Sequence, residues 1–394
     1  MGEPRAIQLR SERIITPAGT IAGAVRIVGG QIASVEVVGA ATRAGADEVV
    51  ELGRRWVAPG YVDLHVHGGG GAQCNTTELD ELAAVARFHA AHGTTALLAS
   101  TVAAPPQRLA ASVATIARAT AGLREGAAIL GSHLEGPFLS RRRPGAMDPA
   151  LFVDPSPELL ARVLDAGGGS VALITLAPEL PGALALIGAL CDAGVVTSIG
   201  HSDATYAQTR AAVGAGARAV THLFNAMRPF DHREPGVLGA ALELPELSCE
   251  LICDGLHVAP AALALALRAK GAGAIRLVTD AMQAAGMPDG EYRLGAAAVT
   301  VAGGRATIAG TGTLAGSTLT LDVAVRNAVE LLGVSVEQAV ALASGNPARL
   351  LGLQRRKGAI APGMDADLTV LDDDLTALAT IVAGAWVHRP ASGW

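Results

Sequence analysis

Six side chains with the chemistry of metal ligands stand at or near the ends of short apolar runs in this sequence. They are His65, His67, Glu135, His201, His222 and Asp280. Imidazoles and carboxylates without paired cysteines are typical ligands of zinc, iron(II), cobalt or manganese. Such an ion lowers the pKa of bound water and polarises a carbonyl, so that hydrolysis needs no protein nucleophile. The residue types therefore favour metal-assisted hydrolysis.

The spacing of these residues supports one shared site. His65 and His67 are two residues apart in an apolar run, and alternate side chains of a strand point the same way. Asp280 ends the last run, where it could take a proton from an attacking water and return it to a leaving nitrogen. The sequence has no G-x-S-x-G motif for a competing serine nucleophile. We expect Asp280 to be the general acid and base.

The elements that must position these residues alternate in a regular way. Eight runs rich in Val, Ile, Leu and Thr are separated by alanine-rich stretches of helical periodicity. The runs cover residues 60–68, 94–101, 128–137, 171–179, 195–201, 219–225, 250–257 and 274–281. Eight strand-helix units over about 220 residues predict an α/β fold of the (β/α)8 TIM-barrel type. The active site of such a barrel lies at the carboxyl ends of its strands, where the six candidate residues would converge.

Helices are expected between these runs, over residues 78–92, 106–121, 157–166, 183–193, 205–215 and 259–270. A doubly wound open sheet is the alternative fold. It would more often carry a phosphate-binding glycine motif after its first strand. The glycines at 68–71 lack the G-x-G-x-x-G order, and we interpret them as a loop.

The two ends of the chain differ from its middle. Residues 1–58 and 356–394 contain short alternating strands with turns. We predict that they form one small β domain, and that residues 59–355 form the hydrolase barrel. The expected role of the small β domain is to stabilise the barrel.

Composition narrows the class of protein. Half of the 394 residues are hydrophobic and 17% are charged, which indicates a compact globular chain. The formal net charge is -6 and basic residues are scattered, so we expect no nucleic-acid partner. The opening residues have neither a signal-peptide pattern nor a membrane-spanning length, so we expect a cytoplasmic protein without a membrane partner. The four cysteines lack the spacing of a disulfide framework or a zinc ribbon.

Several longer motifs carry a family resemblance. They are PGYVDLHVHG (59–68), HLEGPF (133–138), LAPE (176–179), GHSDAT (200–205), THLFNAM (221–227), REPG (233–236), DGLHV (254–258), VTDAM (278–282), LAGS (314–317) and NPAR (346–349). With them the chain resembles the amidohydrolase superfamily and, within it, the N-acetylglucosamine-6-phosphate deacetylases. The resemblance runs through essentially the whole chain. It implies a TIM barrel with a small β-sandwich made from both termini.

The resemblance also implies roles for the candidate ligands. Glu135, His201 and His222 would be the main metal ligands, with Asp280 as the catalytic acid and base. Because both His65 and His67 are present, one or two ions could bind, with zinc expected before iron, cobalt or manganese. Some related enzymes bridge two ions with a carboxylated lysine, but the run at 171–179 contains no lysine. Glu135 is then the candidate bridge.

A second set of residues would hold a sugar phosphate if the resemblance extends to the substrate. They are Ala146, Met147, Asn225, Ala226, Arg233, His257, Leu314, Ala315, Gly316 and Ser317. The position of Arg233 reaches a neighbouring subunit's substrate in similar proteins, so a homodimer is implied. The planar fork of an arginine is well suited to phosphate oxygens.

One departure from the family pattern affects the substrate. Family members commonly have Lys-Gly-Ala-His after the HLEGPF motif, whereas this chain has Arg-Pro-Gly-Ala-Met at 143–147. A polar substrate contact is thereby replaced by an adaptable thioether at Met147. The run at 141–143 of three arginines could compensate at the phosphate or form a solvated loop.

The resemblance implies deacetylation of N-acetylglucosamine 6-phosphate to glucosamine 6-phosphate and acetate. One alternative keeps the chemistry on another substrate, such as N-acetylgalactosamine 6-phosphate, another N-acylated amino sugar or a cyclic amide. A further alternative is a catalytically silent barrel kept as a binding protein.

Overall fold

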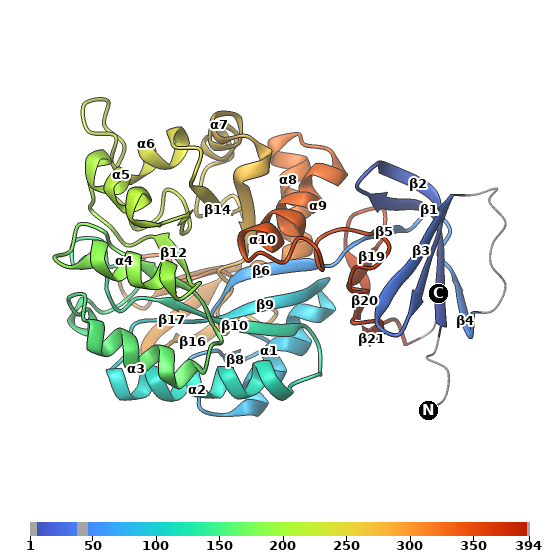
Figure 1. The fold of residues 1–394 in the computed structure, drawn as a ribbon, viewed down its shortest axis with the longest axis horizontal. Helices are drawn as coiled ribbons and strands as arrows, with labels where there is room; N and C mark the ends of the chain where they lie inside the picture. Colours follow the sequence, from blue (N-terminus) through green and yellow to red (C-terminus); the bar gives the residue numbers. More distant parts are fainter. Residues whose placement is uncertain (1–5, 38–45, 392–394) are drawn as a thin grey trace.

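The structure is a computed structural model that describes residues 6–37 and 46–391. Residues 1–5, 38–45 and 392–394, all within the predicted small β domain, lie outside the described residues. Figure 1 shows two bodies, a large barrel surrounded by helices and a smaller sheet domain that carries both ends of the chain.

Eight parallel strands form the barrel. They are β6 (Tyr61–Val66), β9 (Thr94–Thr101), β10 (Ala128–Glu135), β11 (Val171–Leu176), β12 (Val196–Ile199), β13 (Ala219–Val220), β14 (Ser248–Ile252) and β15 (Ile275–Val278). All eight overlap the predicted runs, and β14 begins two residues before the run at 250–257. The two edge strands, β6 and β15, meet where the amide of Asp280, just past the end of β15, donates to the carbonyl oxygen of His65 within β6 over 2.9 Å. The predicted (β/α)8 class is confirmed.

Helices cover the outside of the barrel. They are α1 (Leu79–Ala91), α2 (Pro106–Gly122), α3 (Pro157–Gly167), α4 (Ala183–Asp192), α5 (Tyr206–Ala215), α6 (Gly236–Glu243), α7 (Pro260–Lys270), α8 (Leu321–Leu332), α9 (Val336–Ala343) and α10 (Gly345–Leu350). The predicted helices correspond to α1 to α5 and α7. Local sequence explains their ends: Thr205 and Gln208 form a capping box at α5, and Gly168 ends α3 in the left-handed region.

The small domain is one hydrogen-bonded sheet drawn from both ends of the chain. Its strands are β1 (Ala6–Thr16), β2 (Gly19–Val28), β3 (Gln31–Val37), β4 (Glu48–Glu51), β5 (Trp56–Pro59), β19 (Leu368–Leu371), β20 (Ala377–Val382) and β21 (Ala385–His388). Antiparallel pairing of β5 with β19 places Pro59 opposite Leu368 and joins the two ends. Leu9, Ile27 and Ile381 belong to a buried cluster of the domain's own. The boundaries at 58 and 355 stay a prediction.

A three-stranded antiparallel sheet follows the last barrel strand. It consists of β16 (Gly290–Leu294), β17 (Ala297–Ala302) and β18 (Arg305–Ile308), and the sequence analysis did not predict it. Further short elements are β7 (Gly68–Gly69), β8 (Ala72–Gln73), and the 3-10 turns Pro149–Leu151 and Ala272–Ala274. The backbone beyond β18 first runs beside that strand, where the amide of Ala315 donates to the carbonyl oxygen of Ala306 over 3.1 Å, and then reaches the barrel, where the amide of Ser317 donates to the carbonyl oxygen of Asp280 over 2.7 Å. The added sheet thus borders the segment that ends in the predicted substrate residues.

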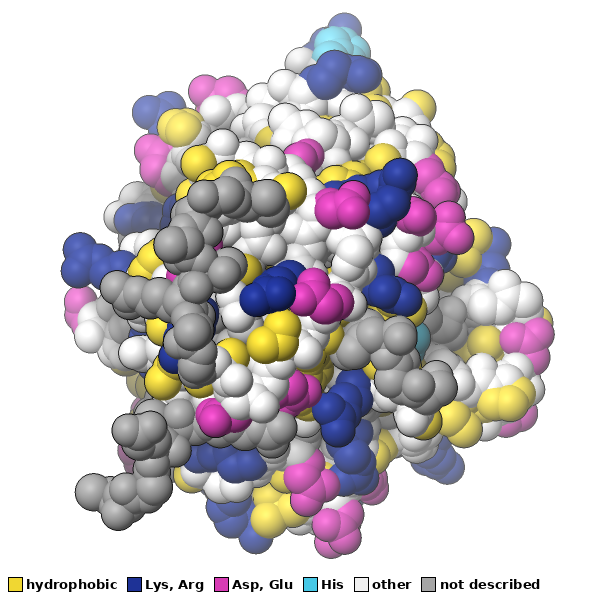
Figure 2. Space-filling view, turned by 90° about the vertical axis from the view of Figure 1, so that its right-hand side faces the viewer, with side chains coloured by type: hydrophobic (Ala, Val, Ile, Leu, Met, Phe, Trp, Pro, Cys, Tyr) yellow, Lys and Arg dark blue, Asp and Glu magenta, His cyan; other side chains and the backbone are white. Residues whose placement is uncertain are grey.

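The surface of the small-domain end carries mixed charge. Figure 2 shows that acidic and basic side chains are interspersed over this face, with apolar side chains between them. Among the described residues, none of the helices has both the length and the apolar character needed to cross a membrane.

Candidate active site

The six candidate ligands converge at the carboxyl ends of the barrel strands. Their ligand atoms form two groups, each within 4.8 Å, namely His65 with His67 and Asp280, and Glu135 with His201 and His222. Every one of these residues is buried. The barrel therefore brings together residues as distant in the sequence as His65 and Asp280, which are 215 positions apart.

Glu135, at the end of β10, lies between the two groups. Its Oε1 atom is 3.0 Å from Nε2 of His201 and 2.9 Å from Nε2 of His222. Its Oε2 atom is 3.2 Å from Nε2 of His67. One carboxylate thus contacts histidines of both groups, which is the arrangement that a bridging ligand requires.

The hydrogen bonds of the outer ring nitrogens test whether these residues fit a cation. Nδ1 of His65 faces a carboxylate oxygen of Glu250 at 3.2 Å, and Nδ1 of His201 faces the carbonyl oxygen of Arg143 at 3.0 Å. Since the carbonyl oxygen and the ionised carboxylate accept, each Nδ1 carries a proton, which leaves Nε2 as the ring atom that would present a lone pair to a bound ion. The centre thus gathers imidazole nitrogens and carboxylates, a donor set that fits a divalent ion of the zinc type.

The electrostatics of the site agree with this fit. Burial opposes the negative charge of Glu135, but the charges of His201 and His65 lower its pKa well below the ordinary value. Burial also opposes the charge on Asp280, while His65 and His67 lower its pKa to about 2. Both carboxylates are therefore ionised because the histidines beside them carry positive charge in this buried place, and a bound cation would supply that charge instead.

Three of the six candidate ligands have backbone angles that side chains rarely adopt. The φ angle is +47° at His201, +28° at His222 and +50° at Asp280. Such angles cost on the order of 1–3 kcal/mol each and persist where the surrounding structure imposes them. Each of the three follows its strand by two residues, so the turn after the strand aims the side chain inward.

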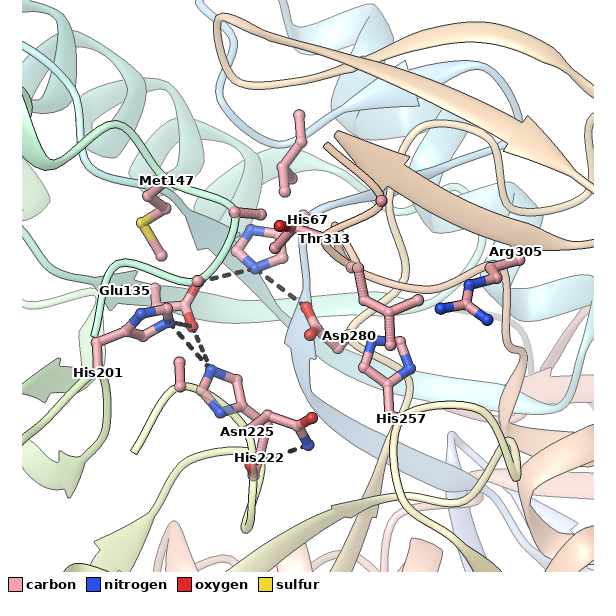
Figure 3. A pocket seen from close by; sticks show the side chains of 17 residues that line it. His67, Glu135, Met147, His201, His222, Asn225, His257, Asp280, Arg305 and Thr313 are labelled. Atoms are coloured by element: carbon pink, nitrogen blue, oxygen red, sulfur yellow. Dashed lines mark hydrogen bonds and ion pairs between the residues drawn. The ribbon is translucent and has the colours of Figure 1, made fainter. Parts of the chain in front are cut away.

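A cavity of about 380 Å³ opens above the two groups, and Figure 3 shows the side chains around it. Of the predicted substrate residues, seven line it, namely Ala146, Met147, Asn225, Ala226, His257, Leu314 and Gly316. Nδ1 of His257 donates to Asp254 over 2.6 Å, which fixes the orientation of its ring. Met147 lies near Glu135 and His201, whereas His257 lies on the side of Asp280.

Three predicted substrate residues do not line this cavity. Ala315 is fully buried in an apolar cluster behind it. The Ser317 hydroxyl donates to the carbonyl oxygen of Thr279 over 2.6 Å, and its amide donates to that of Asp280 over 2.7 Å, so Ser317 supports the Asp280 turn. Arg233 is exposed outside the cavity.

The arginine run at 141–143 is held by one acidic residue. Arg142 and Arg143 each approach the carboxylate of Asp203, within 3.3 Å and 2.7 Å respectively, and Arg228 joins them at 3.0 Å. Burial disfavours the charged form of Asp203, but these arginines lower its pKa below the ordinary value. The three ion pairs tie the loop that carries Met147 to the turn after β12. None of the run's side chains lines the cavity.

Sequence reasoning missed two contributors. Glu250, inside β14, is buried and contacts His65, and an acidic residue in an otherwise apolar strand was the available signal. Arg305, at the start of β18, lines the cavity. No sequence signal marked it, because its place depends on how the added sheet folds over the barrel.

Two domain-family profiles match the chain. A profile described as "Amidohydrolase family" matches residues 56–389, which is most of the chain. The chain belongs to the amidohydrolase family. A second profile, "Allantoinase, composite domain", matches residues 8–53. As an amidohydrolase, the protein is a metal-dependent hydrolase, and the inferred family resemblance is confirmed.

Three relatives of this amidohydrolase show how far the similarity extends. The structure of an N-acetyl-D-glucosamine-6-phosphate deacetylase variant from Mycobacterium smegmatis, in complex with N-acetyl-D-glucosamine-6-phosphate, is 45% identical with a TM-score of 0.92 and covers 98% of this chain and 100% of that one. N-acetylglucosamine-6-phosphate deacetylase from Danio rerio is 41% identical over 87% of each chain. N-acetylgalactosamine-6-phosphate deacetylase from Escherichia coli O157:H7 is 40% identical over 93% of this chain and 95% of its own.

Proposed function

We propose that this amidohydrolase hydrolyses the amide of N-acetylglucosamine 6-phosphate and releases glucosamine 6-phosphate and acetate. The observation that supports this reaction most directly is the pair of histidine-carboxylate groups, joined by Glu135, at the base of a cavity sized for a small ligand. The similarity to deacetylases of this sugar phosphate over nearly the whole chain supports the substrate.

The metal assignment is part of the proposal. Glu135, His201 and His222 would hold the first ion, which we take to be zinc because imidazole and carboxylate ligands suit it. His65 and His67, together with Glu135, would hold a second ion. A bound divalent ion supplies a water of lowered pKa and polarises the amide carbonyl.

Asp280 moves the proton in the proposed reaction. Its Oδ1 atom is 3.3 Å from Nε2 of His67 and 3.5 Å from Nε2 of His65, so the carboxylate faces the centre. It takes a proton from the water as oxygen bonds to the carbonyl carbon. It then gives that proton to the nitrogen as the carbon-nitrogen bond breaks, which leaves acetate and the free amine.

The remaining lining residues orient the sugar. Asn225, Ala226, Leu314 and Gly316 line the cavity, and His257 presents its ring from the side of Asp280. Arg233 is exposed and outside the cavity, so we propose that it serves the site of a second copy in a homodimer.

Acetate release by the purified protein tests this function. We expect N-acetylglucosamine 6-phosphate to be deacetylated, activity to fall after chelation, and zinc to restore it. The homodimer is checked in parallel by the mass in solution. Turnover that persists after the metal content has fallen to zero contradicts the mechanism.

N-acetylgalactosamine 6-phosphate is the second candidate substrate, favoured by the relative from Escherichia coli O157:H7. The two sugars differ only in the configuration at C4, so comparison of their kcat/KM values decides between them. A cyclic amide belongs in the same panel. A protein that hydrolyses none of these and still binds the sugar phosphate would instead be a silent binding protein.

A further inference from the structure

Arg305 occupies a distinctive place in the cavity. Among the described residues that line it, Arg305 is the single lysine or arginine. In Figure 3 Arg305 lies on the side of His257, and its guanidinium group points toward the middle of the cavity, across from Glu135 and Met147. The cavity thus has Glu135 and His201 toward one side and a permanent positive charge toward the other.

The backbone around Arg305 is firmly held. Arg305 pairs with Ala302 across the β17–β18 ladder, and Thr307 forms a bridge with Leu314 at the cavity wall. The hydroxyl of Thr318 donates to the carbonyl of Gly304 over 2.7 Å. The strand is therefore attached to the segment that borders the substrate space, which keeps Arg305 at the cavity.

The guanidinium of Arg305 has no hydrogen bond or ion pair within the described parts of the chain. Other arginines near the site differ. Arg143 and Arg228 are paired with Asp203, and Arg293 on β16, the other outer strand of the same sheet, contacts the carbonyl of Ala296. An unpaired guanidinium that faces a cavity is available to bind an anion, and its planar fork can contact two phosphate oxygens at once.

We propose that Arg305 binds the phosphate group of the substrate within its own subunit and sets the preference for phosphorylated amino sugars. This inference rests on the proposed function. It assigns a phosphate contact to Arg305 on β18, in addition to the contact proposed for Arg233 of a second copy. A substrate held between Arg305 and the ligand groups would have its phosphate and its amide at opposite sides of the cavity.

The test compares Arg305→Met with the control Arg293→Met, which removes an arginine of the same small sheet that does not line the cavity. The measured quantity is the ratio of kcat/KM for N-acetylglucosamine 6-phosphate to that for N-acetylglucosamine. We expect Arg305→Met to lower this ratio roughly 10- to 100-fold, as for loss of a charged hydrogen bond. Arg293→Met should leave the ratio within about twofold, since surface changes have small effects.

Product binding separates this proposal from the proposed function. Calorimetry with glucosamine 6-phosphate and with glucosamine gives the same preference without turnover, and Arg305→Met should reduce it by a similar factor. Absence of acetate release by the unmodified enzyme would refute only the function. An unchanged preference in Arg305→Met, or an equal fall in Arg293→Met, would overturn the role of Arg305. A loss of the preference for phosphorylated sugars in Arg233→Met but not in Arg305→Met would also overturn that role.

Discussion

Nδ1 of His65 donates a hydrogen bond to Oε2 of Glu250 over 3.2 Å. The backbone amide of His222 donates to the same oxygen over 3.1 Å, so one carboxylate connects the two ligand groups. Burial opposes the charge of Glu250, but the bond from His65 and the charges of His65 and Arg276 lower its pKa to about 2. Arg276 is fully buried and lies 3.8 Å from the other carboxylate oxygen. Glu250 therefore orients a ligand and balances a buried cation.

Replacement of Glu250 should separate these two roles. Glu250→Gln keeps an acceptor but loses the charge, and we expect metal affinity to fall roughly 10- to 100-fold, as for other partners of ligating histidines. Glu250→Leu also leaves Arg276 unpaired, which should cost about 3 kcal/mol or more of unfolding free energy. The metal content that remains at increasing chelator concentrations measures the change in metal affinity. Urea unfolding measures the change in unfolding free energy. The exposed Glu246→Gln is the control, and unchanged metal affinity in Glu250→Gln would refute the positioning role.

Asp280→Asn tests the proton carrier. We expect kcat to fall roughly 10²- to 10⁴-fold, because the amide cannot accept the proton. Metal held by Glu135, His201 and His222 should remain, since those ligands are unchanged. Acetate release and elemental analysis check both expectations, with the exposed Asp289→Asn as the control. Turnover close to that of the unmodified enzyme would exclude Asp280 from its assigned role.

Met147 separates two cavities. With Ala146 and Leu294 it lines both the catalytic cavity and a neighbouring cavity of about 160 Å³ that extends to Leu151. Met147→Ala should open one into the other. We expect kcat/KM for N-butyrylglucosamine 6-phosphate, relative to the N-acetyl substrate, to rise roughly 10-fold, within the range for burial of added methylenes.

Competition between the two acyl substrates measures this change. Met287→Ala, which shortens an exposed methionine, is the matched control and should keep the original preference. If Met147→Ala also keeps the original preference between the N-acetyl and N-butyryl substrates, the acyl group does not approach Met147.

His89 on α1 should make stability depend on pH. It is fully buried, its Nε2 donates to the carbonyl of Gly68 over 3.0 Å, and burial lowers its pKa from 6.5 to about 4. Between these values the unfolded chain binds more protons than the folded one, so stability falls as pH decreases from 6.5 toward 4. From pH 7.5 to 5 we expect a loss of about 2 kcal/mol from this group.

Urea unfolding of the unmodified protein and His89→Gln at both pH values isolates this contribution. The glutamine can still donate to Gly68 but does not titrate. The unmodified protein should lose about 2 kcal/mol more than the variant on acidification. Equal losses in the two proteins would show that His89 does not cause the dependence.

The fold was largely predictable because its barrel strands are short apolar runs bounded by helices that show clear periodicity. The sheet of β16 to β18 was not predicted, since its strands are partly exposed and lack the fully buried apolar pattern of the barrel strands. Arg305 depends on that sheet and was missed with it. Ser317 was expected at the substrate, but its bonds to the Asp280 turn give it a supporting role.

The sequence by itself determined the kind of chemistry, because the carboxyl ends of parallel barrel strands meet and this chain carries His65, Glu135 and Asp280 near such ends. Tertiary structure alone decided which residues share an atom-to-atom contact. Glu135 lies between two histidine groups, and Glu250 connects them, only because strands distant in sequence close into one barrel. Arg305 reaches the cavity for a similar reason: the direction of a side chain on an added sheet depends on how that sheet packs against the barrel.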